Sequence, residues 1–403
     1  MSVPLLSIRP GHPDFLDLAW GISVGEWADG RVVDMPTGIH RHPVVFVAYD
    51  EGIYAIKELP LRLARHEHEM LRSLEERSTP SARPVGLAVR TWADPQEEWS
   101  GAVITRYVQF AFPYRELVTG AGFGPRRAQM LDAFAHLLVE LHLAGCFWGD
   151  CSLSNVLYRY DAAAIEAVMV DAETVRVYPE LSNGQRAEDL EIMRFNVAGE
   201  MADVAASQGY DLDGADLSLG DDIADRYESL WSELAAVLVV GPEERYRIRE
   251  RIARLNGLGF AVQDIELVPV EGGDRVSMQV KVGSRTYHGQ RLREIVGIDA
   301  SENQARQLLS DLRYHEAKMG ETSPTGKAVS AMRWRTEVVE PLLRRIASIR
   351  PALDPVQGYC DFLNHRFILA SSQGRDVPNY EAFQSWVEAG LPGYDLEEES
   401  TGL

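Results

Sequence analysis

Three polar side chains, Asp150, Asn155 and Asp171, have the types and spacing that phosphoryl transfer requires. Asp150 and Asn155 lie in the loop segment 148–155, which reads Trp-Gly-Asp-Cys-Ser-Leu-Ser-Asn, and Asp171 follows the apolar run 167–170. One carboxylate can orient an acceptor hydroxyl, while an amide and a second carboxylate can hold Mg²⁺ against the phosphates of ATP. We therefore predict that Asp150 is catalytic and that Asn155 and Asp171 are the metal ligands.

Lys57 is the candidate phosphate-binding cation. It lies near the end of a predicted strand, in Tyr-Ala-Ile-Lys, and the helix predicted over residues 61–77 offers Glu67 and Glu69 as partners. A lysine so placed reaches the α- and β-phosphates of ATP when a helix carboxylate holds its ammonium group. Leucines follow Glu67 at helical spacing, so Glu67 lies beside the apolar stripe, whereas Glu69 falls about 200° away. We predict that Glu67 pairs with Lys57 and keep Glu69 as the alternative.

A phosphate-covering loop should precede this strand. The candidate segment 36–42 contains Thr37 and Gly38, but it has one glycine rather than a G-x-G-x-x-G run. Gly38 could still let backbone N–H groups approach a phosphate. A G-x-x-x-x-G-K-[ST] motif is absent, which disfavours a P-loop enzyme.

Periodicity predicts an α+β protein in three parts. In residues 1–110 the pattern predicts a small, mostly antiparallel sheet with one helix, because the apolar runs 44–49 and 53–59 flank a short turn at Asp50-Glu51-Gly52. In residues 111–238 the periodicity predicts a helical region around the Asp150 loop. Its helices are expected over 125–145 and 188–236, with a break near 209–220. Residues 240–403 begin again with a helix over 243–255 and a second hairpin over 260–282, and further helices are predicted over 299–319, 327–349 and 357–370.

Composition narrows the class of protein. With 403 residues, 45% hydrophobic and 25% charged, the chain has the composition of a soluble globular protein. Its net charge of −21 disfavours binding to nucleic acid or to anionic membranes. Three scattered cysteines form neither a disulfide framework nor a zinc site. With no signal-peptide pattern and no transmembrane segment, we expect a cytoplasmic protein.

In their order along the chain, these motifs resemble the protein-kinase-like superfamily. The similarity covers roughly residues 30–235 and is greatest to a bacterial lipopolysaccharide-core-kinase-like group whose members carry an extra C-terminal domain of unknown function. It implies a bilobal fold with a small antiparallel N-lobe sheet and a helical C-lobe, followed here by the mixed α+β domain of residues 240–403. It also implies a hinge at 104–108, so Arg106 and Val108 should contact the nucleotide together with Lys57, Asn155 and Asp171.

Two departures from the superfamily pattern are visible. Trp148 stands where the family usually has a histidine two residues before the catalytic aspartate, and the metal motif reads Asp-Ala-Glu from Asp171 instead of Asp-Phe-Gly. No Ala-Pro-Glu follows it. The resemblance therefore implies a compact C-lobe without a long regulated activation segment.

The expected function is ATP-dependent phosphorylation of a hydroxyl group on an acceptor that the sequence does not name. One alternative is a nucleotide-binding pseudokinase or scaffold that recruits a protein partner through residues 240–403, and another is transfer of AMP. The C-terminal part also carries a basic group at Arg285, His288, Arg291, Arg293, Arg306 and Arg313. This group could bind an anionic acceptor, although surface ion pairs with the abundant carboxylates are the simpler interpretation.

Overall fold

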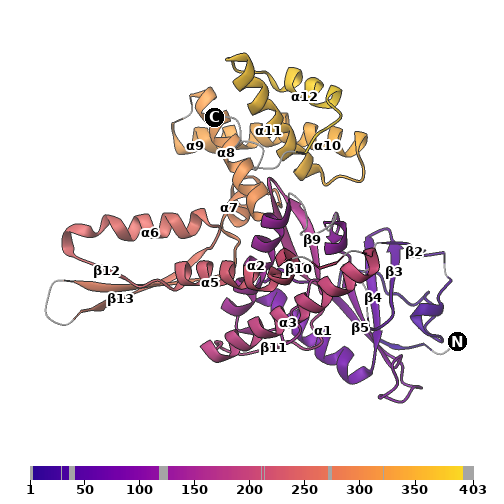
Figure 1. Cartoon of the computed structure of the whole chain (residues 1–403). Coiled ribbons are helices and arrows are strands. Elements are labelled where there is room, and N and C mark those ends of the chain that lie inside the picture. Colours follow the sequence, from indigo (N-terminus) through magenta and orange to yellow (C-terminus); the bar gives the residue numbers. More distant parts are fainter. Residues whose placement is uncertain are drawn as a thin grey trace. The chain divides into compact units, whose positions relative to one another are not determined.

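The structure of the chain is a computed structural model that describes residues 3–28, 30–35, 41–117, 126–209, 211–212, 214–270, 275–320 and 322–393. The chain divides into two compact units. The first comprises residues 1–158 and 167–233, and the second comprises residues 159–166 and 234–403. Each unit has its own core, and helices and strands are labelled in Figure 1.

The N-terminal part of the first unit is an antiparallel six-stranded sheet in the order β1-β5-β6-β4-β3-β2. The central hairpin pairs β3 (Val44–Tyr49) with β4 (Gly52–Leu59), as the apolar runs around Asp50-Glu51-Gly52 predict. The edge strands are β1 (Leu5–Ile8) and β2 (Val32–Val33), and the remaining inner strands are β5 (Pro84–Val89) and β6 (Gly101–Arg106). Because β4 lies between β3 and β6, Lys57 stands on an inner strand of this sheet.

Helix α1 (Leu61–Glu76) follows β4 and packs against β5 and β6. Its buried residues recur at helical spacing and are Ala64, Glu67, Leu71 and Leu74. Glu67 is therefore a buried carboxylate on an otherwise apolar face, while Glu69 is exposed. The helix phase read from the sequence matches the side of α1 that meets the sheet.

The N-terminal segment, which shows no periodicity in the sequence, is tied to this sheet by side chains. Its Phe15, Trp20 and Trp27 belong to one buried cluster with residues of β3 to β6. Ser23 Oγ and the Val24 N–H donate to the Glu58 carboxylate, at 2.6 and 2.7 Å, and Arg90 pairs with the same carboxylate on its other side. Since tertiary contacts order this segment, local patterning could not reveal it.

The remainder of the first unit is mainly helical. It contains α2 (Arg127–Leu143), α3 (Asn183–Gln208), α4 (Gly214–Leu217) and α5 (Leu219–Ala235). Between α2 and α3 lie the Asp150 loop and the short strands β8 (Cys146–Phe147), β9 (Val156–Asp161), β10 (Ala164–Met169) and β11 (Arg176–Val177). Helix α3 begins five residues earlier than the predicted helix because Ser182 caps it, accepting from the Gln185 N–H.

The second unit combines a three-stranded sheet with helices (Figure 1). The sheet has the order β12 (Leu238–Val240), β14 (Val276–Val282), β13 (Val262–Pro269). The helices are α6 (Tyr246–Gly257), α7 (Tyr287–Val296), α8 (Glu302–Met319), α9 (Pro324–Arg333), α10 (Glu340–Ile349), α11 (Pro355–Gln373) and α12 (Asn379–Glu388), with a π-helical stretch, Trp334–Val339, between α9 and α10. Helices α7 and α12 were not predicted from the sequence.

The unit division keeps residues 1–110 and most of 111–238 in one unit, begins the second unit at residue 234 instead of 240, and assigns one earlier segment to it. We expected residues 111–238 to form a single helical region, yet residues 159–166, the tip of the β9–β10 hairpin, belong to the second unit. The physical reason is that this tip is buried in the core of the second unit, where Ala162 is 8% exposed. None of the helices in the described ranges is long and apolar enough to cross a membrane.

Candidate active site

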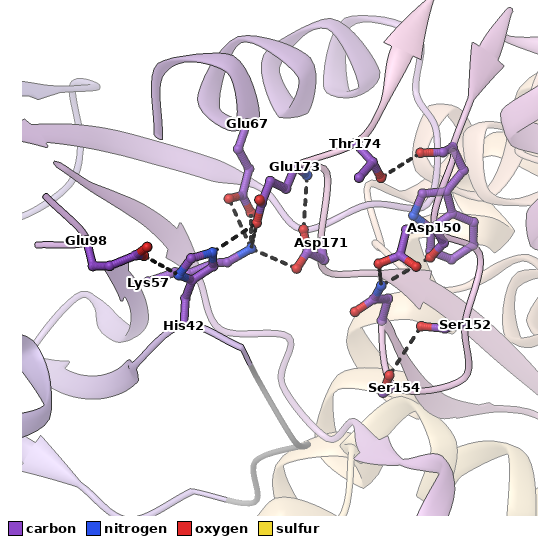
Figure 2. Close-up of polar contacts among 12 residues, drawn as sticks. His42, Lys57, Glu67, Glu98, Asp150, Ser152, Ser154, Asp171, Glu173 and Thr174 are labelled. Carbon is purple, nitrogen blue, oxygen red and sulfur yellow. Dashed lines mark hydrogen bonds and ion pairs between the residues drawn. The ribbon is translucent and has the colours of Figure 1, made fainter. Parts of the chain in front are cut away.

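Lys57 lies among three carboxylates (Figure 2). Its Nζ is 3.1 Å from Glu67 Oε2 on α1, 2.7 Å from Asp171 Oδ2 and 3.8 Å from Glu173 Oε2. His42, 4% exposed, lies 3.4 Å from the same Glu173 oxygen and 3.2 Å from Glu98. The structure thus brings together two of the predicted site residues, Glu67 and Asp171, around the predicted lysine.

The charges in this cluster do not balance, since three carboxylates face one ammonium group. Burial alone would lower the pKa of Lys57, but the charges of Glu67 and Asp171 outweigh it and hold that pKa above its ordinary value. Burial raises the pKa of Glu67 to about 7 despite the opposing charge of Lys57, and the nearby Asp171 carboxylate adds to the rise. The surplus negative charge suits a divalent cation next to Asp171.

The raised pKa of Glu67 predicts a pH-dependent stability. The folded protein keeps this proton up to about pH 7, whereas the unfolded chain releases it near the ordinary value of 4.5. The free energy of unfolding of the wild type, relative to Glu67→Gln, should therefore fall by roughly 3 kcal/mol between about pH 4.5 and pH 7. Urea denaturation of both proteins across this range measures the difference.

Glu69→Gln is the matched control because it neutralises an exposed carboxylate on the same helix. It should retain the wild-type pH dependence. A stability difference between wild type and Glu67→Gln that stays constant with pH would contradict the assignment.

The Asp150 carboxylate is held by two asparagine side chains. Asn155 Nδ2 donates to Asp150 Oδ2 at 3.1 Å, and Asn196 Nδ2 on α3 donates to Asp150 Oδ1 at 2.9 Å and to the Cys151 carbonyl at 3.2 Å. Asp150 itself is exposed, so an acceptor can reach it. Both carboxylate oxygens are thereby fixed in direction while their remaining lone pairs stay available.

One face of α3 anchors the whole Asp150 loop. Asp189, fully buried, accepts the backbone N–H groups of Trp148 and Gly149, both at 2.7 Å. Two turns further along α3 comes Asn196, and one turn beyond it Glu200 accepts the N–H groups that follow Ser152, namely Leu153 at 2.7 Å and Ser154 at 2.8 Å. Sequence reasoning did not identify Asp189, Asn196 or Glu200. Their spacing of seven and four residues, which places them on one helix face, is the only local signal.

The environment of Trp148 explains how the loop tolerates its departure from the family pattern. The side chain is fully buried and stacks on Phe134, with ring centroids 6.1 Å apart. Its backbone makes the polar links, because the Trp148 carbonyl accepts from Thr174 Oγ1 at 2.8 Å while the N–H binds Asp189. Gly149 follows at φ +78°, where a side chain would be strained. A histidine side chain is therefore not needed to join the loop to the Asp171 segment.

The two predicted metal ligands lie on neighbouring backbone segments. The Val170 N–H donates to the Asn155 carbonyl at 3.0 Å, so Asp171 follows directly on a residue bonded to Asn155. Because Asn155 uses its amide nitrogen on Asp150, its amide oxygen is left for a metal ion. An amide oxygen and a carboxylate are the hard ligands that suit Mg²⁺, which takes its other ligands from phosphate and water. No group of three or more His, Cys, Asp or Glu able to hold a metal occurs among the described residues.

A cavity opens beside this cluster between the sheet and the Asp150 side of the unit. Its polar wall includes Lys57, Glu67 and Asp171. The hinge residues Arg106 and Val108 also line it. Its apolar wall consists of side chains suited to a flat ring, including Val44, Phe46, Ala55, Val103 and Leu157. The two candidates in the phosphate-covering loop, Thr37 and Gly38, lie outside the described residues.

Three members of the basic group, Arg285, His288 and Arg293, have partners within the second unit. His288 Nδ1 lies 2.7 Å from Glu302, Arg293 pairs with Asp299 at 2.5 Å, and Arg285 donates to the Leu258 carbonyl at 3.1 Å. These contacts favour the surface ion-pair interpretation over an anionic acceptor site. The cysteines are buried free thiols, and burial raises the pKa of Cys146 and Cys151, so neither is poised for thiolate chemistry.

Comparison with protein families matches two separate parts of the chain. Residues 52–210 match the lipopolysaccharide kinase (Kdo/WaaP) family, and residues 229–391 match a domain of unknown function, DUF4032. No curated protein matches the chain.

The chain also matches solved structures, among them the following two. One is WaaP in complex with acyl carrier protein, 18% identical over 57% of this chain and 84% of its own, with a TM-score of 0.33. The other is the Rio2 kinase–ADP/Mg²⁺–phosphoaspartate complex from Chaetomium thermophilum, 14% identical over 50% of this chain and 70% of its own, with a TM-score of 0.32.

These findings confirm the predicted α+β fold class and the predicted resemblance. Residues 52–210 are therefore similar to the lipopolysaccharide kinase (Kdo/WaaP) family, and residues 229–391 are separately similar to a domain of unknown function.

Proposed function

We propose that the protein is a phosphotransferase that moves the γ-phosphate of ATP to a hydroxyl group on a small molecule, a sugar or a protein. The observation that carries this proposal is that hydrogen bonds connect the residues around Lys57 to the loop that contains Asp150. The Lys57–Asp171 ion pair lines the cavity, and the Val170–Asn155 and Thr174–Trp148 hydrogen bonds connect the Asp171 segment to the loop of Asp150.

At the hinge, backbone groups of Arg106 and Val108 would meet the edge of adenine. The N–H groups of Arg106 and Tyr107 are used inside the sheet, by the carbonyls of Arg83 and Ile53 at 2.9 and 3.0 Å. The Arg106 carbonyl and the Val108 N–H would accept from and donate to the base. The apolar wall of the cavity would cover the faces of the ring.

At the phosphates, Lys57 would bind the α- and β-phosphates while Glu67 holds its ammonium group in place. Asn155 and Asp171 would hold Mg²⁺, which supplies charge neutralisation of the phosphate oxygens. The Lys57 ammonium group donates directly to the Asp171 carboxylate, so the lysine and a metal ion bound to Asp171 would contact the same phosphate chain.

At the acceptor, Asp150 would accept a hydrogen bond from the attacking hydroxyl and take its proton. The new bond joins the acceptor oxygen to the γ-phosphorus, the bond from that phosphorus to the ADP oxygen breaks, and ADP leaves. Asn196 and Asn155 keep the Asp150 carboxylate aimed at the acceptor, so positioning and electrostatics supply most of the rate.

The test is incubation of the full chain with Mg²⁺ and either γ-labelled or α-labelled ATP, with a panel of monosaccharides and casein as acceptors. We expect Mg²⁺-dependent transfer of the γ-label alone to an acceptor or to the chain itself, with a mass increase of one phosphate. Transfer of the α-label would instead establish AMP transfer.

Two other outcomes reject the proposal. Binding of Mg²⁺ and ATP by calorimetry without any transfer would identify a pseudokinase that acts through a partner of residues 240–403. Failure to bind ATP at all would remove the nucleotide from the assignment.

A further inference from the structure

The β9–β10 hairpin has its base in one unit and its tip in the other. Asn155 immediately precedes β9 and Asp171 closely follows β10. The two candidate metal ligands therefore flank the hairpin where its two strands begin and end, at the base. The tip, residues 159–166, belongs to the second unit. The hairpin is therefore a covalent link between the C-terminal unit and the metal pair.

The tip is clamped by one glutamine of α11. Gln357 Oε1 accepts the Ala162 N–H at 2.8 Å, and Gln357 Nε2 donates to the Ala162 carbonyl at 2.9 Å. Ala162 has φ +57°, a conformation that disfavours residues other than glycine. Such a residue persists where its surroundings determine its conformation, and here both backbone polar groups of Ala162 bind one buried side chain.

A second contact ties the tip to the first turn of α8. Asp161, fully buried, accepts the N–H of Gln304 at 2.8 Å and the N–H of Asn303 at 3.1 Å, together with Asn303 Nδ2 at 2.9 Å. These N–H groups lie in the first turn of α8, where no backbone carbonyl of the helix is available to them, so Asp161 caps the helix together with its N-cap residue Ser301. The capping carboxylate belongs to the hairpin, whereas the helix belongs to the C-terminal domain. The first turn of α8 therefore has all its capping contacts only when the hairpin tip is in place.

The hairpin has limited support at its base. Strand β9 pairs with the two-residue strand β7 (Phe112–Pro113), and β10 meets Ser81 through a single bridge at Met169. A two-stranded hairpin is marginally stable by itself. The Val170–Asn155 hydrogen bond, which keeps the metal pair together, therefore benefits from a tip that cannot fray.

We propose that the C-terminal unit positions the metal pair Asn155 and Asp171 through this hairpin, and that Gln357 and Asp161 are positioning residues for Mg²⁺. The proposal rests on the proposed function in one respect, which is that Asn155 and Asp171 bind the metal. It assigns to the C-terminal unit a role in positioning the metal ligands through the hairpin that the two units share.

The test compares Gln357→Ala with the wild type in the full chain by hydrogen exchange and by Mg²⁺ titration of phosphate transfer. We expect the amides of residues 156–158 and 167–170, which lie in the first unit, to exchange about tenfold faster in the variant. The Mg²⁺ concentration for half-maximal transfer should rise about 10- to 100-fold, the usual loss when the residues that orient metal ligands are removed. The KM for ATP at saturating Mg²⁺ should change little.

Asp311→Asn is the matched control, since Asp311 is a buried residue of the second unit bonded to Trp334, Tyr359 and Arg366 rather than to the tip. It should leave exchange at the hairpin base and the Mg²⁺ requirement at wild-type values. If Gln357→Ala does not fold, Asp161→Asn gives the same comparison with a nearly isosteric side chain.

The outcomes separate this inference from the proposed function. If Gln357→Ala and Asp161→Asn both show wild-type hydrogen exchange and a wild-type Mg²⁺ requirement, the inference is overturned, but the proposed phosphate transfer is not affected. An equal effect of Asp311→Asn would also overturn it, because general loosening of the second unit would then suffice. Absence of phosphate transfer by the wild type would overturn the proposed function and the metal role, while hydrogen exchange would still decide whether the C-terminal unit holds the hairpin.

Discussion

The Asp150→Asn variant is expected to transfer phosphate about 10²- to 10⁴-fold more slowly than the wild type while binding ATP with similar affinity. Asparagine has the size of aspartate but cannot take the proton of the acceptor hydroxyl. The backbone N–H groups of the loop donate to the carboxylates of Asp189 and Glu200, and these bonds do not involve the Asp150 side chain. The change should therefore appear in kcat and leave the KM for ATP nearly unchanged.

The measurement is steady-state transfer of γ-label at saturating ATP, with ATP affinity measured by calorimetry. Asp225→Asn is a suitable control because Asp225 is an exposed aspartate on α5 of the same unit. Full activity of Asp150→Asn would remove this residue from the chemistry. A parallel loss of ATP binding would show that Asp150 acts on nucleotide binding rather than on the acceptor.

The Lys57→Met variant is expected to lose about 10²- to 10³-fold in kcat/KM for ATP, comparable to removal of a donor that faces developing charge. Lys57 is the cation that links Glu67 and Asp171, and methionine keeps the length of the side chain without its charge. With the ammonium group gone, the pKa of Glu67 should rise further, so that its carboxyl becomes neutral at pH 7. Both KM and kcat should be affected, in contrast to Asp150→Asn.

Initial rates over a range of ATP concentrations give the two constants, and urea denaturation reports whether the variant is folded. Lys281→Met provides the control, because Lys281 is exposed on β14 of the second unit. Wild-type kcat/KM in a folded Lys57→Met protein would contradict the phosphate-binding role.

The elements around Lys57 could be predicted closely because their signals are local. The strand runs 44–49 and 53–59 and the helix 61–77 correspond to β3, β4 and α1 within one residue at each end. The phase of α1 also separated Glu67 from Glu69, since burial repeats with the helical period. In such segments the pattern of apolar and polar side chains is enough to predict where the element begins and ends and which face is buried.

Other parts of the fold could not be predicted because distant contacts create them. Helices α7 and α12 have ten residues each and mixed surfaces, and their buried residues are defined by the core of the second unit. The N-terminal aromatics Phe15, Trp20 and Trp27 pack on a sheet formed by later residues. Short isolated helices and segments without periodicity gain their stability from tertiary packing.

The same distinction applies to the site. The sequence by itself determined the chemistry available in each segment, namely the Asp150–Asn155 spacing, the carboxylate of Asp171 after an apolar strand, and the phase of Glu67 towards Lys57. These features are local because they depend on residue type and on the repeat of one strand or helix.

Only the tertiary structure decided which groups hold these residues in place. It brings Asp171 and Glu173 to Lys57, aligns Asp189, Asn196 and Glu200 of α3 along the Asp150 loop, and seats Ala162 of the hairpin tip on Gln357 of the second unit. The physical reason is that buried donors and acceptors must find partners, and here those partners lie between 40 and 195 residues away. No local pattern encodes such a pairing.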